Sequence, residues 1–523
     1  MKTTEGHRRS TQSAGNRSSL TLIFAGAAVL AFLGLAVGND LTRAPWWDEG
    51  LFADVALNFR NFGHFGSSLL TPTGFLRFPE VHRYTYWQFP FYMVAEGYWL
   101  RLVPTTIVWI RMLSTLFGLL YTAAWFVVVR ALSQSSRLAL FVTAVVALDY
   151  ALISAASDAR MDMMCAALGL CSLAVYSHLR ERNWTAAVGV AAWFAAASLF
   201  CHPMGLIPNA VLTAFVLIEW RKFRLFGMIA ILPYTLGIAL CFRYISLAPT
   251  VFRAQSSAQS AMRSAGAAAL LRNVLNDAST RYVGFYYASL AGSNKLKVFG
   301  LLFAIAGSVG LLLDRRTQYH LLRSMLLLWS VIAYIGVAAI DNQKLPMYFV
   351  YSMPFLVASA AVWVYEAWER HSKTRVLAGL LLCGSMASTL GGFVYKICKN
   401  DYQTVYMPAI RAIEDSLPHD GIVMGGSELA FALGFGPKLI DDRYLGYGSL
   451  VRPDIFVSNY YYGELLGSGL HDAWVWSRQT LQDEYHQIFQ NSAYVVFLRN
   501  DVTPNGPPGK GTTVKTSSSA TLP

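Results

Sequence analysis

The chain has 523 residues, of which 55% are hydrophobic and only 14% are charged. A soluble globular protein carries roughly a quarter charged residues, so this composition excludes an ordinary soluble enzyme and is typical of a protein that crosses a membrane several times. The formal net charge is +12. Because Lys and Arg fall in short segments between apolar runs, we attribute this excess to membrane orientation and expect no nucleic-acid partner.

The N-terminal segment is basic and polar over residues 1–19, and an apolar stretch follows from Leu20 to Val37. This stretch is longer than the apolar core of a usual signal peptide. We therefore predict a first transmembrane helix at 20–38, preceded by a cytoplasmic basic tail at 1–19.

Ten further apolar segments have about the length that a helix needs to cross a bilayer, roughly 20 residues. They are 106–129, 138–156, 163–178, 184–201, 204–220, 225–247, 298–313, 324–340, 348–366 and 376–395. We thus predict an α-helical polytopic membrane protein of about eleven transmembrane helices, with a transmembrane domain over 20–395.

The charges of the connecting loops predict the orientation. The loops on the side of the N-terminus hold thirteen Lys and Arg residues, whereas the short turns on the other side hold only Arg160 and Lys344. Cytoplasmic loops carry such an excess of Lys and Arg. We expect a multi-pass protein of the cell membrane, in the bacterial inner membrane, with a cytoplasmic N-terminus and an extracytoplasmic C-terminal domain.

Two long segments, 39–105 and 248–296, fall outside the membrane in this topology. The second contains Arg residues among small and aromatic ones. It is compatible with an interfacial amphipathic helix, but we favour an ordinary surface helix at the membrane.

The tail after Lys396 differs in kind, because it mixes charges, glycines and short apolar runs. Three of these runs have the length of strands: Gly421–Met424, Asp454–Val457 and Ala493–Leu498. Helical patterns lie at 405–416 and near 478–490. We predict a small outer α/β domain over 396–502, followed by a disordered tail at 503–523 that is rich in Gly, Pro, Ser and Thr.

The cysteines give no sign of a metal site or of a disulfide framework. Five of the six lie in or at the end of apolar runs, and none has the spacing of metal ligands. The six are Cys165, Cys171, Cys201, Cys241, Cys383 and Cys398. We expect no metal and no cofactor.

The first outer loop begins with two adjacent carboxylates, Asp48 and Glu49, which follow Trp46 and Trp47. An interfacial aromatic belt with solvated acids would explain this composition. Alternatively, partial desolvation at the membrane surface raises the proton affinity of a carboxylate, which suits a general base. We favour the second interpretation and predict that Asp48 and Glu49 are catalytic.

A short outer turn at 157–162 carries Asp158, Arg160 and Asp162. Ionisable residues at the end of a span are costly unless they are used or paired. The two acids are four residues apart, which would place them on one helical face. This group either binds substrate or forms an internal salt bridge between two helices. His202, just before Pro203, is a further candidate, although a histidine before proline is more often a packing residue.

Lys344 is the second outer cation, and it precedes Pro346 and Tyr348. Because the positive-inside rule disfavours a cation there, we expect something to compensate for it. The ammonium group and the Tyr348 hydroxyl would hold a phosphate ester through charge-assisted hydrogen bonds. Alternatively, Lys344 snorkels or pairs with Asp341, three residues before it.

Several segments together resemble the C-type (GT-C) membrane glycosyltransferases, in the superfamily of the protein O-mannosyltransferases and the aminoarabinose transferases. The pattern Asp-Glu-x-x-Phe/Tyr-Ala-Asp/Glu at 48–54 is similar to the first loop of that family. The segments 89–92 and 111–118 resemble its entry into the second span, and 343–348 resembles its late Lys-x-x-x-Tyr loop. The resemblance covers roughly residues 20–395. The aminoarabinose transferases differ at 87–90, where they carry Glu-Lys-Pro-Pro and this chain has Trp-Gln-Phe-Pro.

The resemblance implies an integral-membrane glycosyltransferase of the cell envelope that moves a hexose or pentose from a polyprenyl-phosphate donor to an acceptor hydroxyl on the outer face. The acceptor would be a lipid, a glycan or a protein. Such a donor already has a good leaving group, so the reaction needs a base and cations, and a single displacement would invert the sugar. The substrate-binding candidates are then Lys344, Tyr348, Arg160, Asp158, Asp162 and His202.

Two alternatives belong to other classes. A polytopic membrane transporter would also have about eleven spans, but transporters usually show repeats and broken helices near the midplane. We find no internal repeat, and the charges gather at the outer ends. A non-catalytic assembly or scaffold protein with the same fold is the other alternative, which only an activity assay separates from an enzyme.

Overall fold

The chain forms two compact units in the computed structural model. The first unit comprises Met1–Asn39, Arg111–Arg243 and Arg263–Tyr395, and the second comprises Asp40–Ile110, Tyr244–Met262 and Lys396–Pro523. The structure describes residues 4–71, 78–222, 225–263, 267–287, 295–314, 317–442, 445–447, 449–459 and 471–503.

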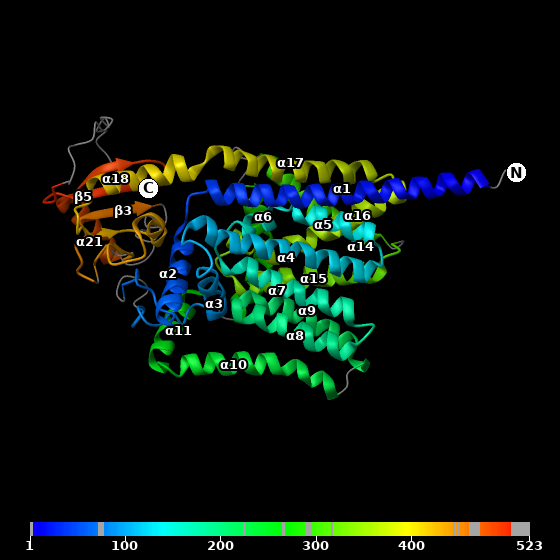
Figure 1. Ribbon diagram of the computed structural model, residues 1–523, viewed down its shortest axis with the longest axis horizontal. Coiled ribbons are helices and arrows are strands. Elements are labelled where there is room, and N and C mark those ends of the chain that lie inside the picture. The colour runs from blue at the N-terminus through cyan, green and yellow to red at the C-terminus, as the bar shows by residue number, and fades with distance from the viewer. Residues whose placement is uncertain are drawn as a thin grey trace. The chain divides into compact units, whose positions relative to one another are not determined.

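The first unit is a bundle of long helices, several of which run alongside one another (Figure 1). Helix α7 packs along α8, and α14 packs along α16. The helices are α1 (Thr4–Thr42), α4 (Ile107–Ser133), α5 (Ser136–Ala147), α6 (Tyr150–Ala156), α7 (Met161–Leu179), α8 (Trp184–Cys201), α9 (Leu206–Ile218), α10 (Ile231–Ile245), α12 (Ala267–Asp277), α13 (Gly284–Tyr287), α14 (Val298–Leu313), α15 (His320–Ile340), α16 (Met353–Glu369) and α17 (Arg375–Lys399).

All eleven predicted spans fall on helices of the described chain. Seven of these helices are long and apolar enough to cross a membrane, and the bent pair α5–α6 would make an eighth. The other three predicted spans correspond to shorter helices, at Pro203–Ile218, Val298–Leu313 and Met353–Glu369. The prediction of a multi-pass membrane protein is confirmed.

One predicted span, 138–156, is not a straight helix. It consists of α5 and α6, which meet at an angle of 64°. Asp149 lies at the break, and its carboxylate accepts hydrogen bonds from the backbone N–H groups of Ala151 and Leu152 at 3.1 and 3.3 Å. This N-cap starts a new helix in a new direction, because it satisfies N–H groups that a continuous helix would bond internally.

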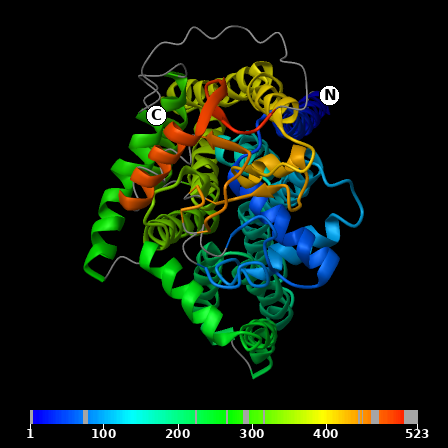
Figure 2. The same cartoon turned by 90° about the vertical axis from the view of Figure 1, so that its left-hand side faces the viewer.

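The second unit combines helices with a five-stranded mixed sheet (Figure 2). Its helices are α2 (Trp47–Phe62), α3 (Pro90–Trp99), α11 (Pro249–Arg263), α18 (Met407–Ser416), α19 (Ala430–Leu433) and α21 (His471–Glu484). Its strands are β1 (Val423–Met424), β2 (Leu439–Ile440), β3 (Ile455–Asn459), β4 (Tyr485–Gln490) and β5 (Tyr494–Arg499). The order is β2-β1-β3-β5-β4, parallel from β2 to β3 and antiparallel from β3 to β4.

The core of this unit forms where α18 covers the sheet. Ile410 and Ile413 of the helix are fully buried with Val423, Ile455 and Val496 of three strands. The alternation of buried and half-buried residues along β5 is that of a strand with one face in the core. We predicted the segment 396–502 as a small outer α/β domain. In the structure it folds in the same unit as residues 40–110.

The secondary structure predicted for the C-terminal segment is correct in part. The three apolar runs are strands β1, β3 and β5, and the helix predicted at 405–416 is present. The helix predicted near 478–490 is wrong in its second half, because α21 ends at Glu484 and 485–490 form β4. Tertiary pairing decides this: β4 bonds antiparallel to β5, and the buried Tyr485 donates its hydroxyl to the carbonyl of Pro453 at 2.7 Å. Most of the tail predicted to be disordered, 504–523, lies outside the described residues.

Candidate functional site

The two predicted catalytic carboxylates lie side by side in the first turn of α2 but in different environments. Glu49 is fully buried. One of its oxygens accepts a hydrogen bond from Arg43 Nη2 at 2.7 Å, and the other accepts from the backbone N–H of Trp46 at 3.1 Å. Asp48 is only half-buried. Glu49 thus holds the chain at the helix start, and Asp48 is the more exposed of the two carboxylates.

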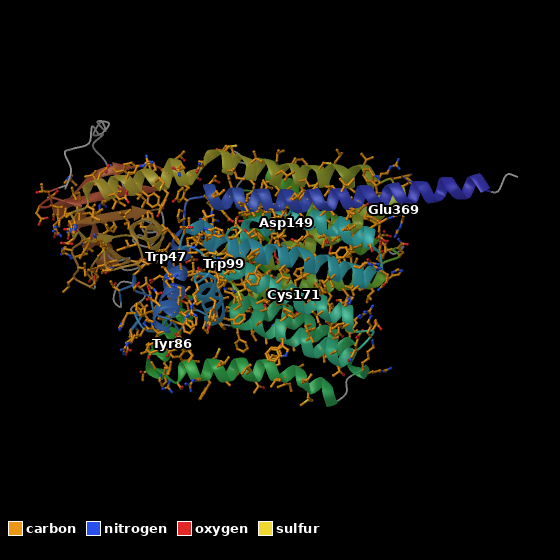
Figure 3. All side chains as sticks on the ribbon, in the orientation of Figure 1. Trp47, Tyr86, Trp99, Asp149, Cys171 and Glu369 are labelled. Atoms are coloured by element: carbon orange, nitrogen blue, oxygen red, sulfur yellow. The ribbon has the colours of Figure 1, made fainter. Side chains whose placement is uncertain are left out.

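A residue of the C-terminal sheet region fixes the start of α2. The indole Nε1–H of Trp47, labelled in Figure 3, donates a hydrogen bond to Asp441, which is fully buried. The same carboxylate oxygen accepts from the backbone N–H of Ser427 at 3.1 Å and from the Ser427 hydroxyl. The backbone N–H of Asp441 donates to the carbonyl of Leu69 at 2.8 Å. Asp441 therefore connects three separate segments of the second unit.

Gly50 allows the close approach that this arrangement needs. A Cβ atom placed on Gly50 would lie 2.1 Å from the carbonyl oxygen of Ser427, far inside van der Waals contact. Only glycine fits where α2 crosses the short helix η9 (Ser427–Leu429). The Gly after the two acids is therefore a packing requirement of the second unit.

Asp54 is the third carboxylate of α2 and is almost fully buried. It accepts hydrogen bonds from the hydroxyls of Ser67 and Ser68 at 2.6 and 2.5 Å and from the N–H of Leu69 at 3.3 Å. These bonds lower the proton affinity of Asp54, but burial outweighs them and raises its pKa to about 6. Asp54 ties the 67–69 segment to α2 and titrates near neutral pH.

Glu96 on α3 is a buried acid that we did not predict. It is fully buried, and neither of its carboxyl oxygens has a hydrogen-bond partner among the described residues. Burial, together with the negative charge of Glu49, raises the pKa of Glu96 well above its usual value. Burial therefore favours the protonated form of Glu96, and the nearby negative charge of Glu49 adds to this effect.

In the first unit, the structure brings four of the predicted substrate-binding residues together. Arg160 Nε pairs with Asp162 at 2.8 Å, and both residues are buried. The ring of His202 lies 5.6 Å from that of Tyr348. Tyr351, which we did not predict, donates its hydroxyl to Asp162 at 3.2 Å, and its ring lies 6.2 Å from that of His202.

The hydrogen bonds of this cluster define its chemistry. His202 Nδ1 accepts from the backbone N–H of Met204 at 3.2 Å, so the neutral ring carries its hydrogen on Nε2. The Arg160 guanidinium lies close enough to the Tyr348 side chain for an electrostatic interaction. A guanidinium, an imidazole N–H and tyrosine hydroxyls are all hydrogen-bond donors, a set that suits an anionic oxygen group.

Asp158 lies half-buried in the turn before α7. The prediction that Asp158 and Asp162 share a helical face is wrong, because α7 begins only at Met161. Asp158 therefore lies in the turn before the helix, whereas Asp162 lies in the first helical turn. Arg160 is extended, with φ −140° and ψ 158°, and its side chain folds back onto Asp162.

Lys344 belongs to a different charged network of the first unit. Its ammonium group pairs with the buried Asp277 at 2.8 Å and also donates to the carbonyl oxygens of Asn273 and Ala338. Arg281 lies between Asp277 and Asp341, at 3.2 and 2.9 Å. The alternative that Lys344 pairs with Asp341 is wrong, because Arg281 pairs with that carboxylate and Lys344 pairs with Asp277. Within the described chain, no group of three His, Cys, Asp or Glu side chains has the arrangement of a metal site.

Comparison with known proteins gives matches only at the level of structure. No family model and no curated protein matches the sequence. The crystal structure of ArnT from Cupriavidus metallidurans bound to undecaprenyl phosphate matches with a TM-score of 0.55 at 14% identity, over 92% of this chain and 98% of that one. An oligosaccharyltransferase from Archaeoglobus fulgidus, in complex with Zn and sulfate, matches with a TM-score of 0.54 at 12% identity, over 91% of this chain and 73% of that one.

The chain shares its fold with ArnT and with the archaeal oligosaccharyltransferase. The match to ArnT spans nearly the whole of both chains. The resemblance inferred from short motifs is thereby confirmed for the fold.

Within this fold, the sequence did contain signals for the residues that we missed. Asp441 and Asp442 are adjacent acids directly after a short apolar run, which is unusual for a solvated loop. Glu96 is a single acid within the apolar segment 89–99. Tyr351 is three residues after Tyr348, a spacing that places both on one side of a helical turn. None of these patterns identifies its partner, because all the partners are distant in sequence.

Proposed function

We propose that this protein is a glycosyltransferase that moves a sugar from a polyprenyl-phosphate donor to an acceptor hydroxyl on the outer face of the membrane. The observation that carries the proposal is Asp48, a half-buried carboxylate that neighbouring groups hold at the start of α2. It stands in a fold shared with a protein that was crystallised with undecaprenyl phosphate. A transporter needs no such carboxylate at a fixed outer helix start.

In the proposed reaction, Asp48 takes the proton of the acceptor hydroxyl as that oxygen attacks the anomeric carbon of the donor. The bond between this carbon and the phosphate oxygen breaks, and its electron pair leaves with the polyprenyl phosphate. The leaving group needs no proton from an acid, because a phosphate diester becomes a stable phosphate monoester anion. One displacement inverts the anomeric centre. Glu49 and Trp47 position Asp48 and do not touch the substrate.

The donor phosphate requires cations and hydrogen-bond donors that strengthen as charge develops. We assign this role first to Arg160, with His202 and Tyr348 as neutral donors and with Asp162 and Tyr351 orienting the guanidinium. Lys344 is the second cation. Its pairing with Asp277 means that it would contribute fully only if the lysine left that carboxylate. Asp158 stays a candidate at the turn that leads into Arg160.

We further propose a bacterial inner-membrane location, a cytoplasmic tail at 1–19, and an outer position for 39–105 and 396–502. The positive-inside bias supports this orientation. The two exceptions to the bias, Arg160 and Lys344, are each paired with a buried acid.

Mass spectrometry of envelope lipids, glycans and proteins from cells with and without the gene tests the function directly. We expect one class of molecule to lose a single hexose or pentose when the gene is deleted. The wild-type gene should restore that sugar, and a gene encoding Asp48→Asn should not. Unchanged sugar composition in all three fractions would refute the proposal.

Labelling of single cysteines tests the orientation. In a cysteine-free background, Ser68→Cys and Gln487→Cys should react with a membrane-impermeant maleimide in intact cells. Lys373→Cys, in a predicted cytoplasmic loop, should react only after the membrane is opened. The reverse pattern would place Asp48 on the wrong side for a donor presented outside.

A further inference from the structure

The second unit contains a cavity that the proposed chemistry does not use. Its volume is about 470 Å³, within the range of roughly 300–1,000 Å³ that is usual for small-molecule sites. The C-terminal half of α2 forms one wall, and the loop at 435–437 forms another. Ser68 and Thr105 complete the lining.

The α2 wall has a composition that packing alone does not explain. Asp54, Leu57, Asn58 and Asn61 all line the cavity, and their spacing of i, i+3, i+4 and i+7 places them on one helical face. A helix face that packs into a core is apolar, whereas three of these four residues are polar. The hydroxyls of Ser67 and Ser68 hold the buried Asp54 carboxylate in place, so this wall is rigid.

The polar groups of the wall present both acceptors and donors. Asn58 donates its amide N–H to the carbonyl of Gly66 at 3.0 Å, while its side-chain oxygen accepts from no described residue. Asn61 accepts from Arg60 Nε at 3.0 Å, and its amide nitrogen donates to none of the residues that the structure describes. Arg60 Nη1 bonds to the carbonyl of Leu100 at 2.9 Å. A hydroxyl group both donates and accepts, so a ligand rich in hydroxyls matches this wall.

The charges and the apolar surface of the cavity narrow the class of ligand further. Asp54 and Arg60 carry opposite charges on the same wall, which favours a neutral ligand over an ion. Phe62, Phe435 and Pro437 supply apolar surface, and Phe62 is 69% exposed. A sugar ring has this combination, with hydroxyls around its edge and a face of C–H groups that packs on aromatic rings.

The distance along α2 indicates how such a sugar relates to the reaction. Asp48 and Asn58 are ten residues apart, which corresponds to about 15 Å along a helix. A ligand that reaches from Asp48 to the cavity must therefore be extended. We propose that this cavity binds a neutral sugar unit of an oligosaccharide acceptor, several units away from the hydroxyl that is glycosylated. This inference rests on the proposed function, since it takes Asp48 as the reacting end.

Binding of neutral trisaccharides to the full-length protein in lipid nanodiscs tests the proposal without donor or turnover. We would titrate mannotriose, maltotriose and chitotriose by isothermal calorimetry, and an unglycosylated Ser/Thr peptide in parallel. At least one trisaccharide should bind. Asn61→Ala and Phe435→Ala should each weaken that binding about ten-fold, as is common for central contacts of a binding site.

Gln487→Ala, at an exposed position of β4 outside the cavity, is the matched control and should leave binding unchanged. Thermal unfolding of each variant shows whether it folds. Absence of binding for all three trisaccharides, or binding that the two cavity variants leave intact, would overturn the proposal. Peptide binding that the same variants weaken would assign the cavity to a protein acceptor and overturn it as well.

The Asp48→Asn variant separates the two hypotheses. It should bind the trisaccharide as the wild type does while transferring no sugar. Normal transfer by Asp48→Asn with intact trisaccharide binding would contradict the assigned base only. Loss of trisaccharide binding in Phe435→Ala with unchanged transfer to a short acceptor would support the cavity as a remote subsite.

Discussion

Helices α2 and α7 begin in the same way, one in each unit. Each is preceded by an extended residue, Trp46 or Arg160, and each places an acid in its first turn. A negative charge there is favourable because it faces the positive end of the helix dipole. These features of the helix start alone do not distinguish the two sites.

Their partners make them different. In α7, Asp162 is buried against Arg160 and also accepts the hydroxyl of Tyr351. In α2, Glu49 takes the bonds that fix the backbone, and its neighbour Asp48 stays half-buried. In α7 the first-turn acid orients a cation. In α2, Glu49 fixes the backbone, and Asp48 is the more exposed carboxylate to which we assign proton transfer. The surroundings of each acid, and not the presence of a carboxylate, separate the two roles.

The strongest test of this comparison is the exchange of each acid for its amide. Asp48→Asn should lower transfer on the order of a hundred-fold or more, because an amide of the same shape cannot accept a proton. Donor binding should persist. Both quantities follow from turnover and lipid-binding assays on the purified protein.

The matched substitution in α7, Asp162→Asn, should act on donor binding first, because it frees Arg160 from its orienting partner. If Asp48→Asn retained near-normal turnover, the base would have to be sought at Glu49 or Asp54. Asp54→Asn would then be the informative variant, since the pKa of Asp54 is about 6.

The second test compares the two outer cations. Arg160→Ala should weaken donor binding about ten-fold, because it removes a charge-assisted bond to phosphate. Lys344→Ala should weaken donor binding less and should lower thermal stability more, because among the described residues it leaves only Arg281 to pair with the buried Asp277. A larger loss of donor affinity for Lys344→Ala than for Arg160→Ala would reverse our assignment.

The third test concerns the anchor of α2. Trp47→Phe keeps an aromatic ring but removes the N–H that donates to Asp441. We expect a fall in kcat of about ten-fold with unchanged donor binding, since a small displacement of a catalytic group is costly.

Asp442→Asn is the control for the anchor. Asp442 is as buried as Asp441 and is adjacent to it, but it accepts from Ser449 at 2.6 Å. If Asp441→Asn and Asp442→Asn lowered kcat equally, the effect would be general destabilisation of the sheet region and not positioning of Asp48.

The smallest expected effect is on the pH dependence of stability. The pKa of Glu96 is higher in the folded than in the unfolded protein, so the folded state binds more protons between the two values. Stability should therefore fall as the pH rises from about 4.3, the unfolded value, towards the raised value. Glu96→Gln should remove part of this fall, and the portion due to Asp54, which ends near pH 6, should persist.

Thermal unfolding of the protein in nanodiscs between pH 5 and 8 measures this effect. Glu414→Gln, at an exposed position of α18, should leave the pH profile unchanged. Identical profiles for the wild type and Glu96→Gln would show that burial does not raise the pKa of Glu96.

Much of the membrane fold could be predicted from the sequence. The length of the apolar segments predicted where the helices run. A segment that crosses a bilayer must satisfy its backbone hydrogen bonds internally and expose apolar side chains to lipid. The same reasoning missed the bend at Asp149, since hydropathy averages over a residue that acts through a local cap. It also missed β4, whose strand state depends on pairing with β5.

The sequence by itself determined which charged residues lie where a charge is energetically costly. Asp48, Glu49, Arg160 and Lys344 all stand out from their surroundings. The tertiary structure alone decided their partners. Glu49 pairs with Arg43, and Arg160 pairs with Asp162. Lys344 pairs with Asp277, which lies 67 residues earlier in the chain, on another helix. The physical reason is that a charge is recognised by its own cost of burial, a local property, whereas the group that compensates it is selected by three-dimensional proximity, which sequence spacing does not encode.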